Sequence, residues 1–526
     1  MNVLTAAEMR EVDRLSTTNY RVPSLTLMEN GGKSVAEFIQ SRFPNLARRR
    51  IIVLCGKGNN GGDGFVVARY LRKMGAKPQV FLIGNPREVK GDAATNLRRW
   101  KSIGKLMVVG ASGKAKPFEF RDGAVIVDAL LGTGVRGALE GRLAEVVTGV
   151  NQRNPGCFVV AVDIPSGLNA DTGEAPGPVI VADYTVTFTA PKPGLLLGDG
   201  QKHAGELLVR DIGSPPQLIE ETANGAVRWS EAREFAKFAL PRKAAGHKGD
   251  YGHALIVAGS VGKSGAAVLA GTAALRAGAG LVTVATPEPV LPIVAAHTPE
   301  IMTEPLAATL SGTISEQSLQ GNLFGRLLEG KRALGIGPGL TTQAETQVFV
   351  RAIVRERANV PIVLDADGLN AFAGRAAELR DSRGLLAVTP HPGEMARLLA
   401  CSTAEVQARR IEIAIKAAAD WNAHVILKGY QTVIAAPDGR AWVNSTGNPG
   451  MASGGTGDVL TGMLAGLTAQ YGAESWPDAL AFGVYLHGLA GDIARAEVGG
   501  APLVASDLIR CLPHAFHHFY VECGRA

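Results

Sequence analysis

Asp458 stands directly after a glycine cluster, and this pairing is the part of the sequence that most directly predicts chemistry. The run NPGMASGGTGDVL covers residues 448–460 and leads into an apolar helical pattern. Gly454, Gly455 and Gly457 allow a tight turn and a close approach of the backbone to a ligand, and the free N–H groups of a helix start attract anions. We therefore expect a phosphate group there, with Asp458 as the base that takes the proton of a substrate hydroxyl as it attacks phosphorus.

Further clusters in the second half of the chain also carry polar groups beside glycine turns. GSVGKSGAA at residues 259–267 suggests a phosphate loop, but it lacks the spacing of GxxxxGK[ST], so we reject that interpretation. PHPGE places His391 and Glu394 three residues apart, and Glu394 can organise Mg²⁺ and water around nucleotide phosphates. Taken alone, His391 is more often a surface or capping histidine, and Lys428 in LKGYQT is equally well explained as a solvated lysine.

The first half of the chain places polar residues where apolar runs end. Asn60, Asp128 and Ser166 each follow a different run and can together present hard oxygen donors to a cation such as K⁺, although each alone can be a helix N-cap. Asp163 directly follows FVVAV and is the best acid/base candidate, because the mouth of a parallel sheet is where chemistry gathers. For the motif GNNGGDG, a purely architectural glycine turn is the alternative to ligand binding.

Length and composition indicate an enzyme of two domains. The 526 residues exceed what one core usually holds, and 65 glycines with only 6% aromatic residues favour a turn-rich α/β architecture. The net charge of +6 is mild and the basic run at residues 48–50 lacks interleaved aromatics, so we expect no nucleic-acid site. Five scattered cysteines predict a reducing compartment. Because neither a signal peptide nor a membrane span is recognisable, we expect a cytoplasmic protein without membrane contact.

Alternating apolar runs and helical patterns predict two domains built from βαβ units. The expected strands of the first half are residues 51–55, 79–83, 125–129, 158–162 and 184–188, with a helix over 65–74. Those of the second half are 254–258, 281–285, 362–364, 386–388, 425–427 and 432–436, with helices over 265–277 and 455–469. Paired prolines without periodicity mark a linker at 214–227, so the predicted domains are 1–213 and 228–526.

The motifs GNNGGDG, VDALLGTGVRG and VDIPSGL, in this order within residues 1–213, resemble the YjeF N-terminal domain, the NAD(P)H-hydrate epimerase family. The resemblance implies a Rossmann-like three-layer fold and inversion at C6 of the hydrated nicotinamide ring of NADHX and NADPHX. It implies K⁺ held by Asn60, Asp128 and Ser166, and substrate contact with Asp163. It further implies that the hydrated dinucleotide is bound by Asn59, Asn60, Gly61, Gly62, Asp63, Gly132, Thr133, Gly134, Val135, Arg136, Gly137 and Ala138.

The expected chemistry of that domain is simple. The C6 hydroxyl can leave with the electron push of the ring nitrogen, and water can re-enter the resulting iminium from either face. One acid/base carboxylate suffices for this, and Asp163 in that role is our hypothesis.

KGDYGHALIVAGS, GPG, TPHPGE, LKGYQT and NPGMASGGTGDVLTG, within about residues 228–526, resemble the YjeF C-terminal domain, the ribokinase-like NAD(P)H-hydrate dehydratase family. His391 stands where sugar kinases of this fold carry Asn, and Thr456 stands where many relatives have Met, Ala or another residue. The resemblance implies that the hydrate is bound by Ala266, Gly339, His391 and Asp458. It implies that the adenine nucleotide is bound by Lys428, Gly429, Tyr430, Gln431, Thr432 and Gly457.

Together these resemblances imply a bifunctional repair enzyme. Asp458 would deprotonate the C6 hydroxyl of the S hydrate, which attacks the terminal phosphoryl group of ADP; loss of phosphate and of the C5 proton then regenerates NADH or NADPH and leaves AMP. One alternative is a hydroxymethylpyrimidine or hydroxyethylthiazole kinase-type enzyme, and another is a first half that only binds ligands or partners. We further expect K⁺ and Mg²⁺ as cofactors, a homo-oligomer, and small molecules as the substrates.

Overall fold

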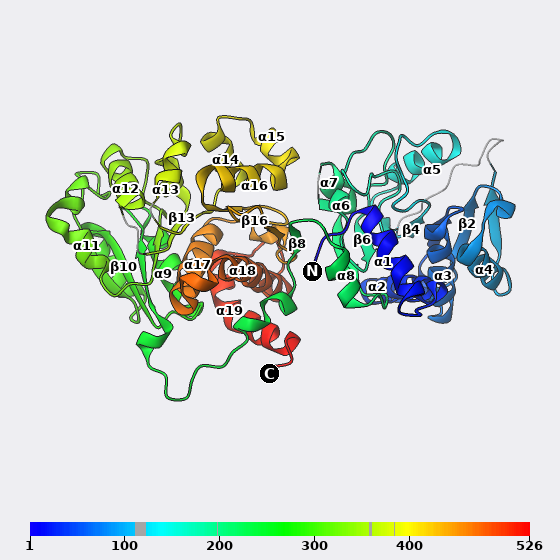
Figure 1. The fold of residues 1–526 in the computed structure, drawn as a ribbon, viewed down its shortest axis with the longest axis horizontal. Coiled ribbons are helices and arrows are strands. Elements are labelled where there is room, and N and C mark those ends of the chain that lie inside the picture. Colours follow the sequence, from blue (N-terminus) through cyan, green and yellow to red (C-terminus); the bar gives the residue numbers. More distant parts are fainter. Residues whose placement is uncertain (111–122, 197, 357–359, 383, 526) are drawn as a thin grey trace. The chain divides into compact units, whose positions relative to one another are not determined.

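The computed structural model describes residues 1–110, 123–196, 198–356, 360–382 and 384–525. The chain divides into two compact units, a first unit of Asn2–Gly225 and a second unit of Met1 with Ala226–Ala526. Each unit is built around one β-sheet with helices packed on it (Figure 1), so the predicted class of two α/β domains is confirmed. Among the described residues, no helix combines the length and the apolar character that a membrane crossing requires.

The first unit holds a seven-stranded parallel sheet of order β3-β2-β1-β4-β5-β6-β7. Its strands are β1 (Ile51–Cys55), β2 (Gln79–Ile83), β3 (Leu106–Val109), β4 (Val125–Ala129), β5 (Phe158–Val162), β6 (Tyr184–Phe188) and β7 (Glu206–Arg210). Its helices are α1 (Ala6–Thr18), α2 (Ser24–Arg42), α3 (Asn59–Lys73), α4 (Gly91–Lys101), α5 (Gly141–Asn151), α6 (Pro193–Leu196), α7 (Gly200–Ala204) and α8 (Pro216–Thr222).

The apolar runs of this sheet are buried on both faces. Ile51, Val53 and Cys55 pack into one core with residues of α2, α3 and α4, whereas Ile52 and Leu54 pack into a second core with residues of α5. Successive side chains of a strand point to opposite faces, so a strand that is apolar at every position needs a helical layer on each side. The first unit is therefore a three-layer αβα domain.

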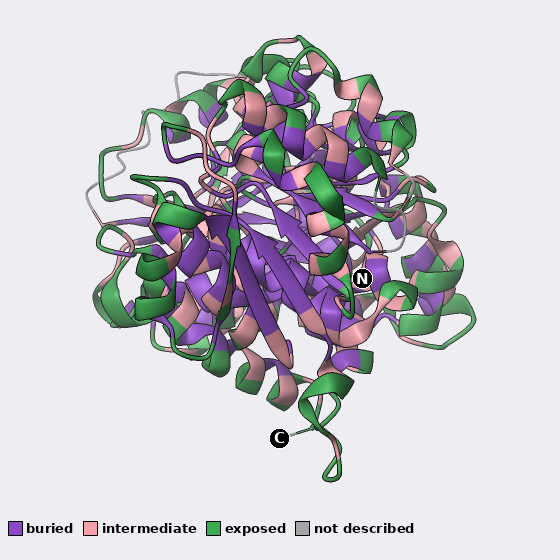
Figure 2. Ribbon diagram, turned by 90° about the vertical axis from the view of Figure 1, so that its left-hand side faces the viewer, coloured by how far each residue is buried: buried purple, intermediate pink, exposed green. Residues whose placement is uncertain are grey.

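The second unit holds a ten-stranded mixed sheet of order β11-β10-β9-β12-β13-β14-β15-β16-β17-β8, in which β16 is antiparallel to both of its neighbours. The strands are β8 (Val227–Trp229), β9 (His253–Val257), β10 (Leu281–Pro287), β11 (Met302–Leu306), β12 (Ala333–Ile336), β13 (Ile362–Leu364), β14 (Leu386–Val388), β15 (His424–Leu427), β16 (Val433–Ala435) and β17 (Ala441–Val443). In Figure 2 its central strands are coloured as buried along most of their length, and the surrounding helices carry the exposed residues.

The helices of the second unit are α9 (Ser264–Arg276), α10 (Leu291–His297), α11 (Leu323–Leu328), α12 (Ala344–Glu356), α13 (Ala366–Asn370), α14 (Pro392–Leu399), α15 (Thr403–Ala408), α16 (Arg410–Trp421), α17 (Thr456–Tyr471), α18 (Trp476–Val498) and α19 (Ala505–Glu522). Helix α17 packs against α9, α18 and strands β9 and β12. Small residues permit this close packing, because a side chain on Gly462 or Gly466 would run into the backbone of α9. The glycine-rich segment before Asp458 thus enters a helix that is rigidly held in the core.

Two local features differ from the sequence-based expectation. The helix expected over residues 65–74 begins earlier, so the motif GNNGGDG, expected as a glycine-rich ligand-binding segment before it, already lies in the helix from Asn59 onwards. Its glycines serve close packing, because a Cβ on Gly64 would stand 2.7 Å from Ala129 Cβ and 2.8 Å from Cys55 Sγ. The segment 214–227, expected as a linker, contains α8, which packs against α1 within the first unit.

Candidate functional site

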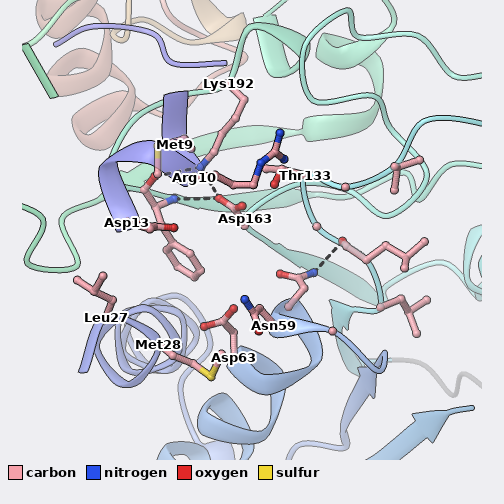
Figure 3. Close-up of a pocket in the computed structure, with 18 of the residues that line it drawn as sticks. Met9, Arg10, Asp13, Leu27, Met28, Asn59, Asp63, Thr133, Asp163 and Lys192 are labelled. Atoms are coloured by element: carbon pink, nitrogen blue, oxygen red, sulfur yellow. Dashed lines mark hydrogen bonds and ion pairs between the residues drawn. The ribbon is translucent and has the colours of Figure 1, made fainter. Parts of the chain in front are cut away.

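The first unit contains a cavity of about 680 Å³ at the carboxyl ends of β1, β4 and β5 (Figure 3). It is lined by Met9, Arg10, Asp13, Ser24, Leu27, Met28, Gly58, Asn59, Asn60, Asp63, Asp92, Leu130, Leu131, Gly132, Thr133, Gly134, Val135, Arg136, Gly137, Leu139, Asp163, Phe188, Lys192 and Ile212. The structure thus brings together Asn59, Asn60, Asp63, the run 132–137 and Asp163 from three separate sequence motifs. Gly61, Gly62 and Ala138 are not among these lining residues; a Cβ on Gly61 would stand 2.0 Å from the Gly56 carbonyl oxygen, and one on Gly62 would stand 2.7 Å from Met28 Sδ.

Asp163 lies at the mouth of the sheet in an unusual backbone conformation. Its φ angle is +66°, a left-handed value that costs about 1–3 kcal/mol in a non-glycine residue and clusters at functional sites. Its Oδ1 atom accepts hydrogen bonds from Thr187 Oγ1 (3.0 Å) and the Phe188 N–H (3.2 Å), and it forms an ion pair with Lys192. Lys192 is only 1% exposed. The sequence-based prediction did not include Lys192, although it lies shortly after the end of β6, where residues of a parallel sheet often take part in the site.

Hydrogen bonds connect the three residues predicted to bind K⁺. Asn60 and Ser166 both contact the backbone of Leu131, and Asp128 contacts Ser166. Asp128 is fully buried and accepts hydrogen bonds from Ser166 Oγ (2.6 Å) and the Ser166 N–H (2.8 Å). Ser166 Oγ accepts from the Leu131 N–H (2.9 Å), and Asn60 Nδ2 donates to the Leu131 carbonyl oxygen (2.8 Å). Burial raises the pKa of Asp128 to about 6, against the hydrogen bonds that lower it. Among the described residues no lysine or arginine pairs with this carboxylate, so its oxygen-rich surroundings fit a small monovalent cation.

In the second unit, Lys428, which follows β15, pairs with two carboxylates: Asp365, which follows β13, and Glu394 in the first turn of α14. Its Nζ atom lies 2.6 Å from Asp365 Oδ1 and 3.8 Å from Glu394 Oε2. Asp365 is 1% exposed, and its Oδ2 atom also accepts a hydrogen bond from Thr461 Oγ1 of α17 (2.7 Å). Burial alone would lower the pKa of Lys428, but the carboxylates of Asp365 and Glu394 more than offset this and raise it. Lys428 is therefore a fixed cation and not the solvated lysine of the alternative interpretation.

Asp458 lies in the first turn of α17, beside this charged group. Burial raises its pKa to about 6, and the neighbouring charge of Asp365 acts in the same direction, while Lys428 opposes it. A carboxyl group with a pKa close to the working pH is suited to act as a general base. Gly457, the residue before Asp458, lies next to Lys428, because a Cβ on Gly457 would stand 3.4 Å from Lys428 Nζ.

His391 is the N-cap of α14, as one of the two interpretations of its sequence allowed. Its Nδ1 atom accepts from the N–H groups of Gly393 (3.0 Å) and Glu394 (3.3 Å), and the Glu394 carboxylate accepts from the His391 N–H (2.7 Å). Desolvation lowers the pKa of His391, although Glu394 opposes this. The neutral ring that results keeps its proton on Nε2, where it can donate a hydrogen bond. One oxygen of the Glu394 carboxylate already accepts a hydrogen bond, so this residue is suited to bind Mg²⁺ through a water molecule.

A second cavity, of about 300 Å³, adjoins Lys428. It is lined by Lys428, Gly429, Tyr430, Gln431, Thr432, Asn444, Thr446, Gly447, Asn448, Pro449, Met451, Ala452, Thr456, Gly457, Leu460, Val484, His487 and Gly488. These include all six residues that the resemblance implied for an adenine nucleotide. Among the other implied residues, Ala266 and Gly339 lie side by side, because a Cβ on Gly339 would stand 3.0 Å from Ala266 Cβ.

Two functional residues of the second unit were missed in the sequence. Asp365 directly follows β13, so the strand-end signal that selected Asp163 would also have selected it. His487 lies in the middle of α18, where nothing in the sequence distinguishes it from a core residue. Its Nε2 atom lies 2.9 Å from the Thr456 carbonyl oxygen, and burial lowers its pKa to about 4, so it is neutral at physiological pH.

Two αβα units, each with a cavity bordered by charged strand-end residues, define this chain as a two-domain α/β enzyme. The family model described as NAD(P)H-hydrate dehydratase matches residues 254–514, and the one described as YjeF-related protein N-terminus matches residues 24–194. The chain is 46% identical to the bifunctional NAD(P)H-hydrate repair enzyme Nnr of Moorella thermoacetica, over 99% of this chain and 98% of that protein. It is 36% identical to the enzyme of that name from Escherichia coli K12, over 96% and 91%. The chain belongs to the bifunctional NAD(P)H-hydrate repair enzyme family.

A solved structure, that of the ADP/ATP-dependent NAD(P)H-hydrate dehydratase from Bacillus subtilis, is 36% identical to this chain. The match covers 56% of this chain and 99% of that one, with a TM-score of 0.47. The two relatives matched over nearly their full length support the bifunctional interpretation over the small-molecule kinase alternative.

Proposed function

We propose that the first unit epimerises the R and S forms of NADHX and NADPHX, and that the second unit dehydrates the S form to NADH or NADPH while ADP becomes AMP and phosphate. The observation that carries this proposal is the arrangement at Lys428. A nucleotide-sized cavity adjoins Lys428, a partly buried cation, and close to it Asp458, a carboxyl group with a pKa near 6, lies at the start of α17. That combination suits phosphoryl transfer to a hydroxyl group.

In the proposed dehydration, Asp458 accepts the proton of the C6 hydroxyl, and the resulting oxygen attacks the terminal phosphorus of ADP. The N–H groups at the start of α17 and the ammonium of Lys428 stabilise the negative charge that develops on the phosphoryl oxygens. Phosphate then leaves from C6 with loss of the C5 proton, which restores the dihydronicotinamide ring. Ala266, Gly339 and His391 would hold the hydrate, and residues 428–432 with Gly457 would hold the nucleotide.

Two cations are part of the proposal. Asn60, Asp128 and Ser166 would hold K⁺, and the buried charge of Asp128, which lacks a cationic side-chain partner among the described residues, supports this assignment. When bound, K⁺ supplies a fixed positive charge beside the dinucleotide-binding wall. Glu394 would position Mg²⁺ and its water on the nucleotide phosphates, where the ion neutralises charge during phosphoryl transfer.

In the first cavity, the resemblance and the lining residues together support binding of the hydrate by Asn59, Asn60, Asp63 and residues 132–137. For Gly61, Gly62 and Ala138 the support is the resemblance alone. Asp163 is the acid/base group in our proposal. The contacts of its Oδ1 atom with Lys192, Thr187 and the Phe188 N–H hold the carboxylate in place at the wall of the cavity.

The test uses the full-length protein with separated R and S NADHX, K⁺, Mg²⁺, and either ADP or ATP. Recovery of NADH absorbance from both hydrates with ADP, with AMP formed in equal amount, is the expected result. A stable phosphorylated product formed with ATP would instead identify the kinase alternative. Conversion of S NADHX alone would refute the epimerase part and leave the dehydratase part standing.

A further inference from the structure

Helix α1 brings a carboxylate into the first cavity that neither the strand-end motifs nor the family match includes. Met9, Arg10 and Asp13 line the cavity, although the family model begins its match at residue 24. In Figure 3 the side chain of Asp13 points into the space that Asp63 and Asp163 also face. A helix outside the recognised domain thus completes one wall of the candidate site.

The position of α1 is determined by its contacts with the segment that carries Lys192. The Leu4 N–H, just before the helix, donates to the carbonyl oxygen of Pro191 (3.0 Å), the residue next to Lys192. At the same end, the Ala6 N–H donates to Asp171 Oδ1 (2.7 Å). These bonds hold the helix beside the ion pair of Lys192 with Asp163.

Four charged groups from four different elements face each other across this cavity: Asp13 of α1, Asp63 of α3, Asp163 after β5 and Lys192 before α6. Arg10, also of α1, lies at the exposed rim. Asp92 and Arg136 also line the cavity. Asp13, Asp63 and Asp163 lie near one buried ammonium group, so keeping all three carboxyl groups ionised is unfavourable. Lys192 pairs directly with Asp163, whereas among the described residues neither Asp13 nor Asp63 has an ion-pair partner.

The surroundings of the two remaining carboxyl groups differ. The Asp13 side chain is exposed to the cavity, yet the enclosing protein desolvates it and raises its pKa to about 6, with Lys192 opposing and Asp163 adding to the effect. Asp63 is 9% exposed, and burial with the nearby Asp163 and Asp13 raises its pKa well above the usual range. An acid that must regain its proton in every turnover works best with a pKa near the working pH. Asp13 meets this requirement better than Asp63.

Inversion at C6 through a planar iminium needs two proton transfers. We propose that Asp13 is a second catalytic carboxyl group of the epimerase site, which protonates the leaving C6 hydroxyl while Asp163 takes a proton from the water that enters on the opposite face. The C6–O bond breaks as the ring nitrogen donates its electron pair, and the oxygen departs as water. A new C6–O bond then forms from the second water, whose proton passes to Asp163. Exchange with solvent returns both carboxyl groups to their starting states.

This inference rests on the proposed epimerase function, and the second unit supplies an internal control for it. In full-length protein with ADP, Mg²⁺ and K⁺, Asp13→Asn is expected to slow conversion of R NADHX to NADH by about a hundredfold or more, with little change in KM. Dehydration of S NADHX should stay at the wild-type rate, which also shows that the protein is folded. Asp13→Glu should restore part of the epimerase rate. Glu11→Gln is the matched control, because Glu11 lies on the same helix and, among the described residues, forms its ion pair with the exposed Arg14.

Two further measurements separate an acid from a merely structural residue. In wild-type protein the epimerisation rate should fall as pH rises above about 6, because the acid must be protonated, and Asp13→Asn should remove this alkaline limb. Without ADP, epimerisation in ¹⁸O-labelled water should place solvent oxygen at C6. Wild-type rates in Asp13→Asn, an effect on KM alone, or epimerisation without ¹⁸O uptake would each overturn the inference. If wild-type protein dehydrates S NADHX but never converts R NADHX, the epimerase function itself fails, and this result is distinct from the others.

Discussion

Replacement of Asp458 by asparagine should make the protein more stable while removing its dehydratase activity. The carboxyl group is largely enclosed, and its pKa is raised from 3.8 to about 6. A carboxyl group whose pKa is higher in the folded than in the unfolded state binds its proton more tightly when folded. As pH rises from about 4 to 6, the unfolded chain gives up this proton first, and the folded state loses stability relative to it.

The size of this effect follows from the pKa difference. At about 1.4 kcal/mol per pKa unit, ionised Asp458 costs the folded state up to about 3 kcal/mol above pH 6. Asparagine has nearly the same shape and carries no charge, so Asp458→Asn should recover a large part of that cost at pH 7. At pH 4 or below, where Asp458 is protonated in the wild type, the two proteins should differ little.

Chemical unfolding of wild type and Asp458→Asn at pH 4 and pH 7 measures this difference directly. Asp420→Asn is the matched control, because Asp420 forms an exposed i, i+4 pair with Lys416 that contributes only about 0.3–0.5 kcal/mol. Dehydration of S NADHX by Asp458→Asn should fall by about a hundred- to ten-thousandfold, while ADP binding persists. In the wild type, the rate should increase with pH through about 6 as Asp458 ionises. A variant that is less stable at pH 7, or that turns over at a near-normal rate, would refute this account of Asp458.

Three other substitutions test the remaining parts of the two sites. Gly462→Ala should destabilise the second unit by about 1–3 kcal/mol, because its methyl group would meet the Ala270 carbonyl oxygen of α9. It should slow dehydration but not epimerisation. Thermal unfolding and the two activity assays measure these effects, and wild-type values would contradict the prediction. Lys428→Met should leave the buried carboxylate of Asp365 without its cation, so we expect a loss of about 3–5 kcal/mol in unfolding free energy and weaker ADP binding by calorimetry. Lys192→Met removes a charged hydrogen bond to Asp163, of a kind worth about 1.5–3 kcal/mol. Conversion of R NADHX should therefore slow roughly ten- to hundredfold, while S NADHX reacts normally. Equal losses on both hydrates would argue against a role of Lys192 in positioning Asp163.

The sequence alone determined most strands of the first unit and the strand-end motifs. All five strands predicted in the first half have the bounds of β1, β2, β4, β5 and β6, because continuous apolar runs between glycine-rich turns leave few other structures open. The glycine cluster before Asp458 likewise predicted a helix start, and α17 begins at Thr456. Edge strand β11 was not predicted because its sequence, MTEPL, is polar at two positions and lacks that continuous apolar pattern. Edge strand β3, LMVV, is apolar throughout but was not predicted either; it is only four residues long and partly exposed.

Only the tertiary structure decided which charged groups meet. Lys428 and Asp365 are 63 residues apart, and their ion pair exists because β14 brings β13 and β15 into one sheet edge. Asp13 and Lys192 line the same cavity because the residues just before α1 contact the segment that follows β6. No local sequence pattern predicts this contact. Secondary structure can be predicted from local periodicity, because it depends mainly on neighbours along the chain. The pKa of Asp458 depends on desolvation and on charges from other strands, and these arise only when the sheet is assembled.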